Sequence, residues 1–312
     1  MKAHFNIYGL PFELETDDPS AFSLFSEELR AFRLKKKSPT FSRRRVRLTV
    51  SVPPRPEGSL RQSTPQEETF LYSKDYLLVR SRYAQRHIHA VARPEFFLQS
   101  DPAYHYCFTQ PAGLWLKQRG LFFLHAGCVA ERAAGILLIG GSRAGKSTLT
   151  LSAVRAGFRY LSDEQPLLSA RNGSVEALAF PRRIRMDATT ARLFPELRRL
   201  SRSPKADRLV FPMEKVWPNS LAPSCKPKVL IFPRFRLRGP RRLSSIPSSA
   251  ALERLLKDDH LLCYRDAPRR RFSRRHLELL KRLARQARAY RLEYSTRDIL
   301  SLPDLFRKLL HE

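Results

Sequence analysis

The 312 residues are 42% hydrophobic, 10% aromatic and 28% charged, which is typical of folded globular proteins and excludes the disordered class. The formal net charge is +29, and its arginines are spread from Arg30 to Arg307 without a basic tail. No run reaches the roughly 18–20 apolar residues that span a bilayer, and the N-terminal segment lacks the apolar core of a secretory signal, so we expect a cytoplasmic protein without membrane contact.

The strong positive charge points to three kinds of partner. Nucleic acid, an acidic peptide and a phosphorylated ligand would each satisfy it. Because scattered arginines also reflect genome base composition, nucleic acid stays the alternative rather than the leading partner. The cysteines lie far apart, with no histidine at zinc-ligand spacing, and are expected to be reduced thiols: Cys107, Cys128, Cys225 and Cys263.

Residues 1–101 are predicted to form a small β-rich N-terminal domain with one helix near residues 19–34. Residues 46–52 (VRLTVSV) alternate apolar and polar side chains, the two-residue period of a half-buried strand. A polar, proline-rich stretch at 53–67 predicts a surface loop. The apolar runs on either side of residues 73–75 predict a hairpin.

Residues 102–312 are predicted to form a second domain of the α/β class. A helical segment closed by Gly120 leads into the strands LFFLHAGCVA and GILLIGG, then the helix KSTLTLSAVRAG and the strand FRYLSDE. The order strand, glycine loop, helix, strand predicts a parallel sheet with a right-handed crossover. Later segments predict two buried strands (VEALAFP, KPKVLIFPRF), an amphipathic helix (SRRHLELLKRLARQARA) and a short helix at 303–310.

The glycine loop matches the phosphate-binding pattern G-x-x-x-x-G-K-[ST] without a mismatch. Its backbone N–H groups and the start of the following helix suit a β-phosphate, and the lysine reaches the β and γ oxygens. An apolar strand enters the loop and an apolar-periodic helix leaves it, which is the context that the motif requires. A glycine turn that binds nothing is the alternative. The residues expected to bind ATP are Gly140, Gly141, Ser142, Arg143, Ala144, Gly145, Lys146, Ser147 and Thr148.

Two adjacent carboxylates, Asp163 and Glu164, follow Lys146 by the length of one helix and one returning strand. This spacing places them at the sheet end beside the loop. Because neighbours on an extended segment point apart, one carboxylate is expected to hold Mg²⁺ with Ser147 and the other to face an acceptor hydroxyl. An acidic turn that only ends the strand is the alternative.

Basic side chains also lie near the predicted loop. A lone histidine such as His125, one strand before the loop, is most often a packing residue. Arg182, Arg183 and Arg185 either clamp phosphates or are solvated charges on a strand.

Residues 125–168 resemble the catalytic domain of HPr kinase/phosphorylase and the related HPr-kinase-like P-loop kinases, and weaker similarity continues through PKVLIFPRF to the C-terminus. The resemblance implies a P-loop kinase domain with an HPr-kinase/PEP-carboxykinase-like core that uses ATP and Mg²⁺. It implies that Lys146 contacts phosphates, that Ser147 holds the metal, and that His125 assists phosphate chemistry. It further implies that Glu164 takes the place of the aspartate that deprotonates the acceptor serine. Of the two adjacent carboxylates, Asp163 is the one expected to hold the metal with Ser147.

The sequence departs from the family pattern at several points. Glu164 is one methylene longer than the usual aspartate, and Arg143 adds charge within the loop. We find no Glu-Ile-Arg-Gly-like segment, with which the bifunctional enzymes hold metal, and this puts phosphorylase activity and HPr as a substrate in doubt. The opening IYGLPFE and the block LHAGCV…GGSRAGKST are instead similar to shorter relatives that act as tailoring kinases for ribosomally made peptides, including lasso-peptide precursors.

The function expected from the resemblance is an ATP-dependent kinase that phosphorylates a serine of a peptide or protein, with the N-terminal domain helping to present the acceptor. The alternative is a P-loop NTPase or switch that binds nucleic acid through its basic surface. A homo-oligomer is compatible with both.

Overall fold

A computed structural model describes the chain except residues 36–44, 52–66, 73–76, 99–102, 201–207 and 259–266. It divides into two compact units, Met1–Arg119 and Gly120–Glu312. Most of the predicted loop at 53–67, the predicted turn at 73–75 and Cys263 lie outside the described residues. The predicted boundary was residue 101, whereas the helix α4 (Gln110–Gln118) groups with the first unit.

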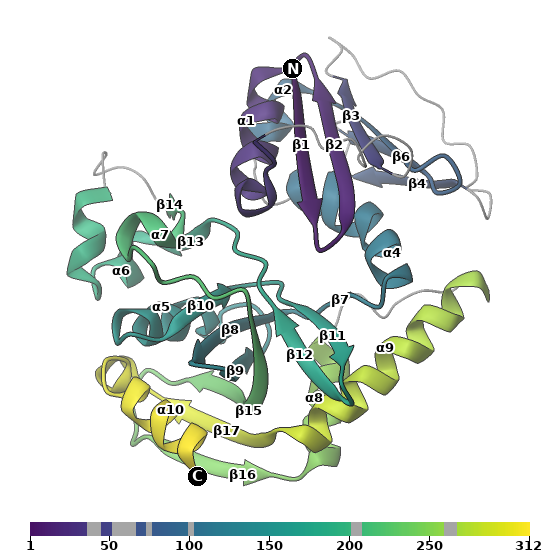
Figure 1. Cartoon of the computed structure of the whole chain (residues 1–312). Helices are drawn as coiled ribbons and strands as arrows, with labels where there is room; N and C mark the ends of the chain where they lie inside the picture. The colour runs from purple at the N-terminus through teal and green to yellow at the C-terminus, as the bar shows by residue number, and fades with distance from the viewer. Residues whose placement is uncertain (36–44, 52–66, 73–76, 99–102, 201–207, 259–266) are drawn as a thin grey trace. The chain divides into compact units, whose positions relative to one another are not determined.

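The first unit is built on a six-stranded mixed sheet (Figure 1). β1 and β2 form a tight hairpin, which turns through two residues of positive φ, Tyr8 (48°) and Gly9 (83°). β2, β3 and β6 run parallel, and β5 and β4 continue the sheet antiparallel. In sheet order the strands are β1 (Lys2–Ile7), β2 (Leu10–Thr16), β3 (Val46–Ser51), β6 (His87–Ala92), β5 (Leu77–Arg82) and β4 (Glu67–Tyr72).

One face of this sheet is apolar and buried, as the alternation of apolar and polar side chains along the strand at residues 46–52 predicts. Phe5, Phe12 and Leu48 are fully buried on it, and the ring of Phe12 meets that of Phe108 edge-on at 5.0 Å. The helical elements of the unit are α1 (Pro19–Glu28), η1 (Arg30–Phe32), α2 (Pro94–Leu98), the π-helical turn η3 (His105–Thr109) and α4.

The second unit contains a nine-stranded mixed sheet (Figure 1). β17 (Arg288–Tyr294) lies beside the end of β15, and β16 (Arg242–Ile246) pairs with β17. The other strands, in sheet order, are β10 (Arg159–Ser162), β8 (Ala126–Glu131), β9 (Ala134–Ile139), β15 (Ser224–Phe235), β12 (Ser174–Leu178), β11 (Leu167–Arg171) and β7 (Phe122–Phe123).

The prediction of a parallel sheet was wrong for half of the strand pairs around the loop. β9, β15 and β17 are parallel. β8, however, lies between β9 and β10 and is antiparallel to both. The reason is the short turn between β8 and β9, which can only connect antiparallel neighbours. The crossover from β9 through α5 to β10 therefore passes over one antiparallel strand.

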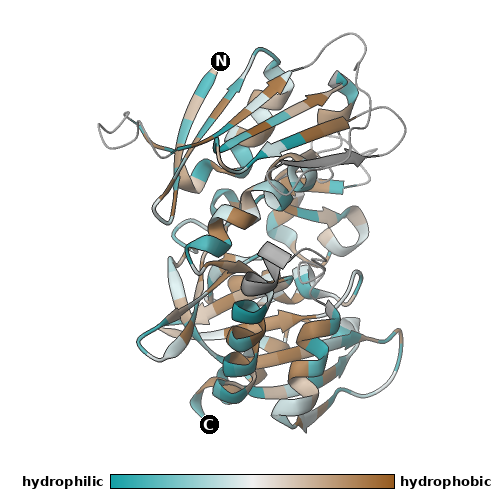
Figure 2. Ribbon diagram, turned by 90° about the vertical axis from the view of Figure 1, so that its right-hand side faces the viewer, coloured by the Kyte–Doolittle hydropathy of each residue, from teal (hydrophilic) through white to brown (hydrophobic). Residues whose placement is uncertain are grey.

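Helices cover both faces of this sheet, and Figure 2 shows hydrophobic residues concentrated on the strands between them. α8 and α9 pack on one face, and α5 and α10 on the other. The elements outside the sheet are α5 (Lys146–Arg155), α6 (Ala188–Ala191), η4 (Pro195–Leu200), α7 (Met213–Val216), α8 (Ser248–Asp258), α9 (Ala267–Gln286), η6 (Thr296–Asp298), α10 (Leu302–His311) and a ribbon of β13 (Ile184–Asp187) with β14 (Arg208–Phe211).

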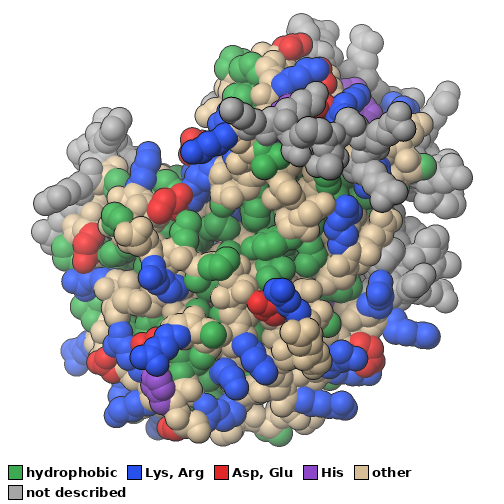
Figure 3. Space-filling model, in the orientation of Figure 1, with side chains coloured by type: hydrophobic (Ala, Val, Ile, Leu, Met, Phe, Trp, Pro, Cys, Tyr) green, Lys and Arg blue, Asp and Glu red, His purple; other side chains and the backbone are tan. Residues whose placement is uncertain are grey.

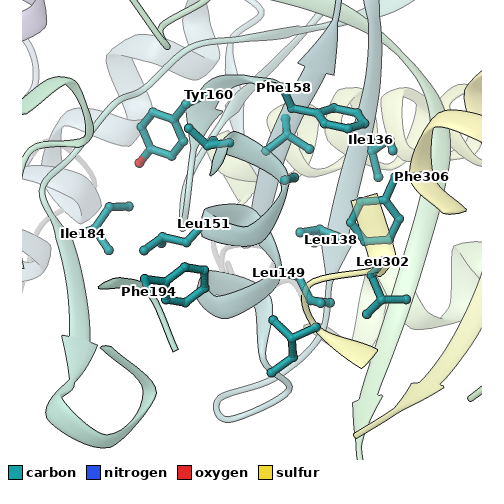
Figure 4. Close-up of a cluster of buried hydrophobic side chains, with 14 of the residues drawn as sticks. Ile136, Leu138, Leu149, Leu151, Phe158, Tyr160, Ile184, Phe194, Leu302 and Phe306 are labelled. Carbon is teal, nitrogen blue, oxygen red and sulfur yellow. The ribbon is translucent and has the colours of Figure 1, made fainter. Parts of the chain in front are cut away.

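The helix after the glycine loop, α5, is held in the larger of the two cores. Leu149 and Leu151 are fully buried among side chains from β9 and α10 and from the segments near β13 (Figure 4). α5 also lies close to β8, because a Cβ added at Gly127 would come within 2.6 Å of Thr150 Oγ1. The position of the loop is thus set by buried contacts on several sides.

None of the helices in the described part of the chain is long and apolar enough to cross a membrane.

Candidate active site

The glycine loop lies between the end of β9 at Ile139 and the first residue of α5, Lys146. Gly145 has φ of 90°, in the left-handed region that favours glycine. A Cβ added there would lie 1.7 Å from Tyr294 Oη, at the end of β17. Both the backbone conformation and the available space therefore require glycine at position 145.

Lys146 folds back over the loop. Its Nζ donates hydrogen bonds to the carbonyl oxygens of Gly140 at 2.5 Å and Gly141 at 3.1 Å. Three residues of the predicted nucleotide-binding segment are exposed: Gly141, Ser142 and Arg143. The partly buried residues of the segment are Gly140, Ala144, Gly145, Lys146, Ser147 and Thr148.

Tyr294 is a loop contact that the sequence did not reveal. Its hydroxyl donates to the Ala144 carbonyl oxygen at 3.4 Å, although the two residues are 150 positions apart. Burial raises the pKa of Tyr294, so the neutral, donating phenol is the form that supports the loop. No local pattern marks this residue, because only the pairing of β15 with β17 brings it to the loop.

Asp163 lies directly after β10, beside the first turn of α5. Burial raises the pKa of its carboxyl to about 6; the nearby hydroxyls of Ser147 and Thr150 and the charge of Lys146 act in the opposite direction, while Glu164 adds to the increase. Its Oδ1 is buried and has no hydrogen-bond partner among the described residues. A buried carboxylate oxygen beside a serine hydroxyl is a suitable pair of oxygen ligands for Mg²⁺.

The described residues contain no cluster of three or more His, Cys, Asp or Glu side chains that would form a metal site by themselves. Mg²⁺ in phosphoryl-transfer sites usually needs only one or two protein oxygens and takes the remaining ligands from phosphates and water. The pair Ser147 and Asp163 therefore fits a nucleotide-bound magnesium.

Glu164 has a different partner from Asp163. Arg182 Nη1 donates to Glu164 Oε2 at 2.5 Å, and the Arg182 side chain is only 5% exposed, against 45% for Glu164. A buried guanidinium thus supports a carboxylate that is open to solvent. Neither predicted role for Arg182, phosphate clamp or solvated strand charge, describes this ion pair. Sequence reasoning missed it because the two residues lie 18 positions apart, on no common helix or strand.

His125 lies between β7 and β8, in a backbone ladder with the segment that follows β10. Leu124 N donates to Pro166 O, and Ala126 N donates to Glu164 O, each at 3.0 Å. This ladder sets the half-buried His125 at the level of residues 164–166, at the carboxyl end of β10. Arg183 and Arg185 are half-buried, and Arg185 contacts the carbonyl oxygen of Arg183 at 3.4 Å.

The cysteines are not among the residues of the candidate site. Cys107, Cys128 and Cys225 are free and buried. The sulfur atoms of Cys128 and Cys225 are 3.8 Å apart.

No protein-family model matches the sequence, and no curated protein matches it either. A search of solved structures finds similarity to the Hpr(Ser) kinase/phosphatase from Coxiella burnetii, at 12% sequence identity and a TM-score of 0.33. The match covers 61% of this chain and 88% of that one.

Proposed function

We propose that this chain is an ATP-dependent kinase that phosphorylates a serine hydroxyl of a peptide or protein. The observation that carries the proposal is the combination of a glycine loop, in which Gly145 packs against Tyr294, with the carboxylate of Asp163, whose Oδ1 is buried, beside Ser147. The loop supplies phosphate donors, and the Ser147–Asp163 pair supplies metal ligands.

Phosphate binding and metal binding are assigned to different residues of the candidate site. Backbone N–H groups of residues 140–147 and the positive end of α5 hold the phosphates. Lys146, which lies over the loop, exchanges its carbonyl partners for phosphate oxygens. Ser147 and Asp163 would hold Mg²⁺, whose charge would offset the negative charge that develops on the phosphate oxygens.

Glu164 is the proposed proton acceptor, and His125 assists at the same end of the sheet. The serine Oγ–H gives its proton to a Glu164 oxygen while Oγ bonds to the γ-phosphorus and the bond from that phosphorus to the bridging oxygen breaks. Arg182 holds Glu164 in a fixed position. The half-exposed Glu164 carboxylate leaves room for an acceptor from outside.

The finer choice of acceptor rests on the sequence resemblance to peptide-tailoring kinases. We propose a ribosomally made precursor peptide rather than HPr, and transfer without phosphorylase activity. The positive charge of +29 agrees with an acidic peptide acceptor.

The test is transfer of label from γ-labelled ATP to candidate precursor peptides and to HPr. Lys146→Met is expected to abolish transfer without unfolding the protein, and the exposed Lys215→Met is the matched control that keeps it. Absence of transfer to every acceptor by a protein that still binds ATP would contradict the proposal.

A nucleic-acid-binding NTPase or switch is the second candidate, favoured only by the net charge. Lys and Arg side chains are scattered over the face seen in Figure 3 rather than gathered in one continuous field. A gel shift with arbitrary DNA or RNA that weakens steeply with salt would favour this candidate. Salt-tolerant phosphorylation of a serine favours the kinase.

A further inference from the structure

The end of β15, the connection that follows it and the first residue of β16 form an exposed basic segment, residues 234–242, which we call the basic loop. It contains five arginines in nine residues, and no acidic residue. Leu237, at its tip, is 89% exposed, and Phe235 is 39% exposed. The basic loop therefore offers a partner apolar contact and positive charge side by side.

The basic loop is connected to the P-loop by direct contacts. The rings of Phe235 and Tyr294 meet edge-on, with centroids 5.6 Å apart, and Tyr294 contacts the Ala144 carbonyl oxygen. Pro233, just before the basic loop, has its carbonyl oxygen 3.9 Å from the Cβ position of Gly140. A partner held on the basic loop is therefore beside the phosphate-binding residues.

The positive charge of the basic loop is only partly neutralised. Glu293 accepts from Arg236 at 2.8 and 2.9 Å and from Arg291 at 2.5 Å, with Arg234 at 3.8 Å. One carboxylate thus serves three guanidiniums. Within the described part of the chain, no carboxylate forms an ion pair with the other three arginines of the basic loop, which are Arg238, Arg241 and Arg242.

The strand that follows the basic loop adds a second means of binding. β16 pairs with β17 on one side, and among the described residues no strand pairs with its other side. Figure 1 shows β16 along the outer edge of the sheet. An edge strand offers backbone N–H and C=O groups to an extended peptide.

We propose that the basic loop and the free edge of β16 dock an extended acidic peptide that carries an apolar side chain, and that this peptide brings the acceptor serine to the P-loop. The proposal rests on the proposed function and names its substrate class. An acidic peptide is favoured over nucleic acid because the most exposed apolar group, Leu237, is aliphatic. The aromatic ring of the basic loop, Phe235, already packs edge-on against Tyr294, whereas single-stranded nucleic acid is held by stacking on aromatic rings.

The experiment measures binding by fluorescence anisotropy, with a fluorescein-labelled peptide of glutamate, leucine and one serine as the probe. A peptide with lysine in place of glutamate and a single-stranded oligonucleotide are compared. The double variant Leu237→Asp/Arg238→Glu changes two exposed side chains and is expected to weaken binding of the acidic peptide by at least about tenfold. Arg192→Glu, at an exposed arginine beyond α6, is expected to bind within about twofold of the native chain.

Binding is also measured with Lys146→Met, which separates docking from phosphoryl transfer. Acidic-peptide binding that survives Lys146→Met and is lost in the double variant supports the docking surface, even if no phosphoserine forms and the kinase proposal fails. Equal binding of the acidic peptide by the native chain and the double variant overturns the proposed docking surface. Preference for the oligonucleotide over the acidic peptide also overturns it.

Discussion

Gly145 combines a left-handed backbone with direct contact to Tyr294, so any side chain there is doubly unfavourable. We predict that Gly145→Ala lowers the free energy of unfolding by about 1–3 kcal/mol, from backbone strain and displacement of the Tyr294 ring. Nucleotide affinity is expected to fall by at least about tenfold, since the clash with Tyr294 shifts the backbone N–H groups that would hold the phosphates. Urea unfolding and titration with a fluorescent ATP analogue measure the two effects.

Gly141→Ala is the matched control within the same loop. A Cβ at Gly141 meets nothing within 4 Å, and its φ is not positive. We expect its free energy of unfolding to stay within about 0.5 kcal/mol of the native value. A Gly145→Ala protein as stable as Gly141→Ala would contradict the predicted role of Tyr294.

Asp163 predicts a pH dependence of stability in the metal-free protein. Its pKa is about 6 in the folded chain against an ordinary value of 3.8, so the folded protein holds a proton that the unfolded chain has released between these values. The contribution of this group to stability is fully present below about pH 4 and is lost as the pH rises through about 6, by on the order of 2–3 kcal/mol.

Asp163→Asn removes this titration. In thermal unfolding with a chelator, we expect the variant to be more stable than the native chain at pH 8 and the difference to disappear toward pH 4. Stabilisation by Mg²⁺ with ATP is expected only in the native chain. The exposed Asp17→Asn serves as the control. A variant that is less stable than the native chain at pH 8 would refute the prediction.

The Arg182–Glu164 ion pair predicts energetic coupling between a buried cation and a half-exposed carboxylate. A double-mutant cycle of Arg182→Met and Glu164→Gln, measured by urea unfolding, is expected to give about 1–2 kcal/mol of coupling. The surface pair Arg171–Glu176, in which Arg171 is 71% exposed, is expected to give less than about 0.5 kcal/mol. Equal coupling in the two pairs would show that Arg182 does not hold Glu164.

At the scale of elements, α5 follows the glycine loop directly, and the position of α5 depends on buried side chains. We predict that Leu151→Ala, in the centre of the cluster in Figure 4, lowers the free energy of unfolding by about 2–5 kcal/mol. Arg155→Ala, at the exposed end of the same helix, is expected to cost at most about 1 kcal/mol through its ion pair with Glu196. Chemical denaturation compares the two, and similar losses would contradict the packing described for α5.

The order of strand, loop, helix and strand around α5 follows from local patterns in the sequence, since glycines that mark turns and the periodicity of apolar residues act over a few residues. The direction of β8 relative to its neighbours does not follow from these local patterns. The sequence pattern of a buried strand is the same in parallel and antiparallel pairs, so only the short connection to β9 and the pairing partners decide it.

At the scale of the whole molecule, the residues proposed for phosphate and metal binding all belong to the second unit. We predict that a fragment of residues 120–312 binds a fluorescent ATP analogue with an affinity within about threefold of that of the full chain, because the second unit has its own buried core. A folded fragment, verified by circular dichroism, that does not bind would show that the first unit contributes to the nucleotide site.

The sequence by itself determined the α/β character of the second unit, the glycine loop with its helix and the placement of Asp163 and Glu164 after the returning strand, because these depend on short-range spacing. Only the tertiary structure decided that Tyr294 contacts the loop at Gly145, that Arg182 pairs with Glu164 and that the basic loop lies beside the glycine loop. Each of these contacts joins separate segments of the chain. β15 and β17 pair beside β9 and bring their carboxyl ends to one edge of the sheet. The segment after β12 is joined to β10 by the hydrogen bond that Phe180 N donates to Leu161 O.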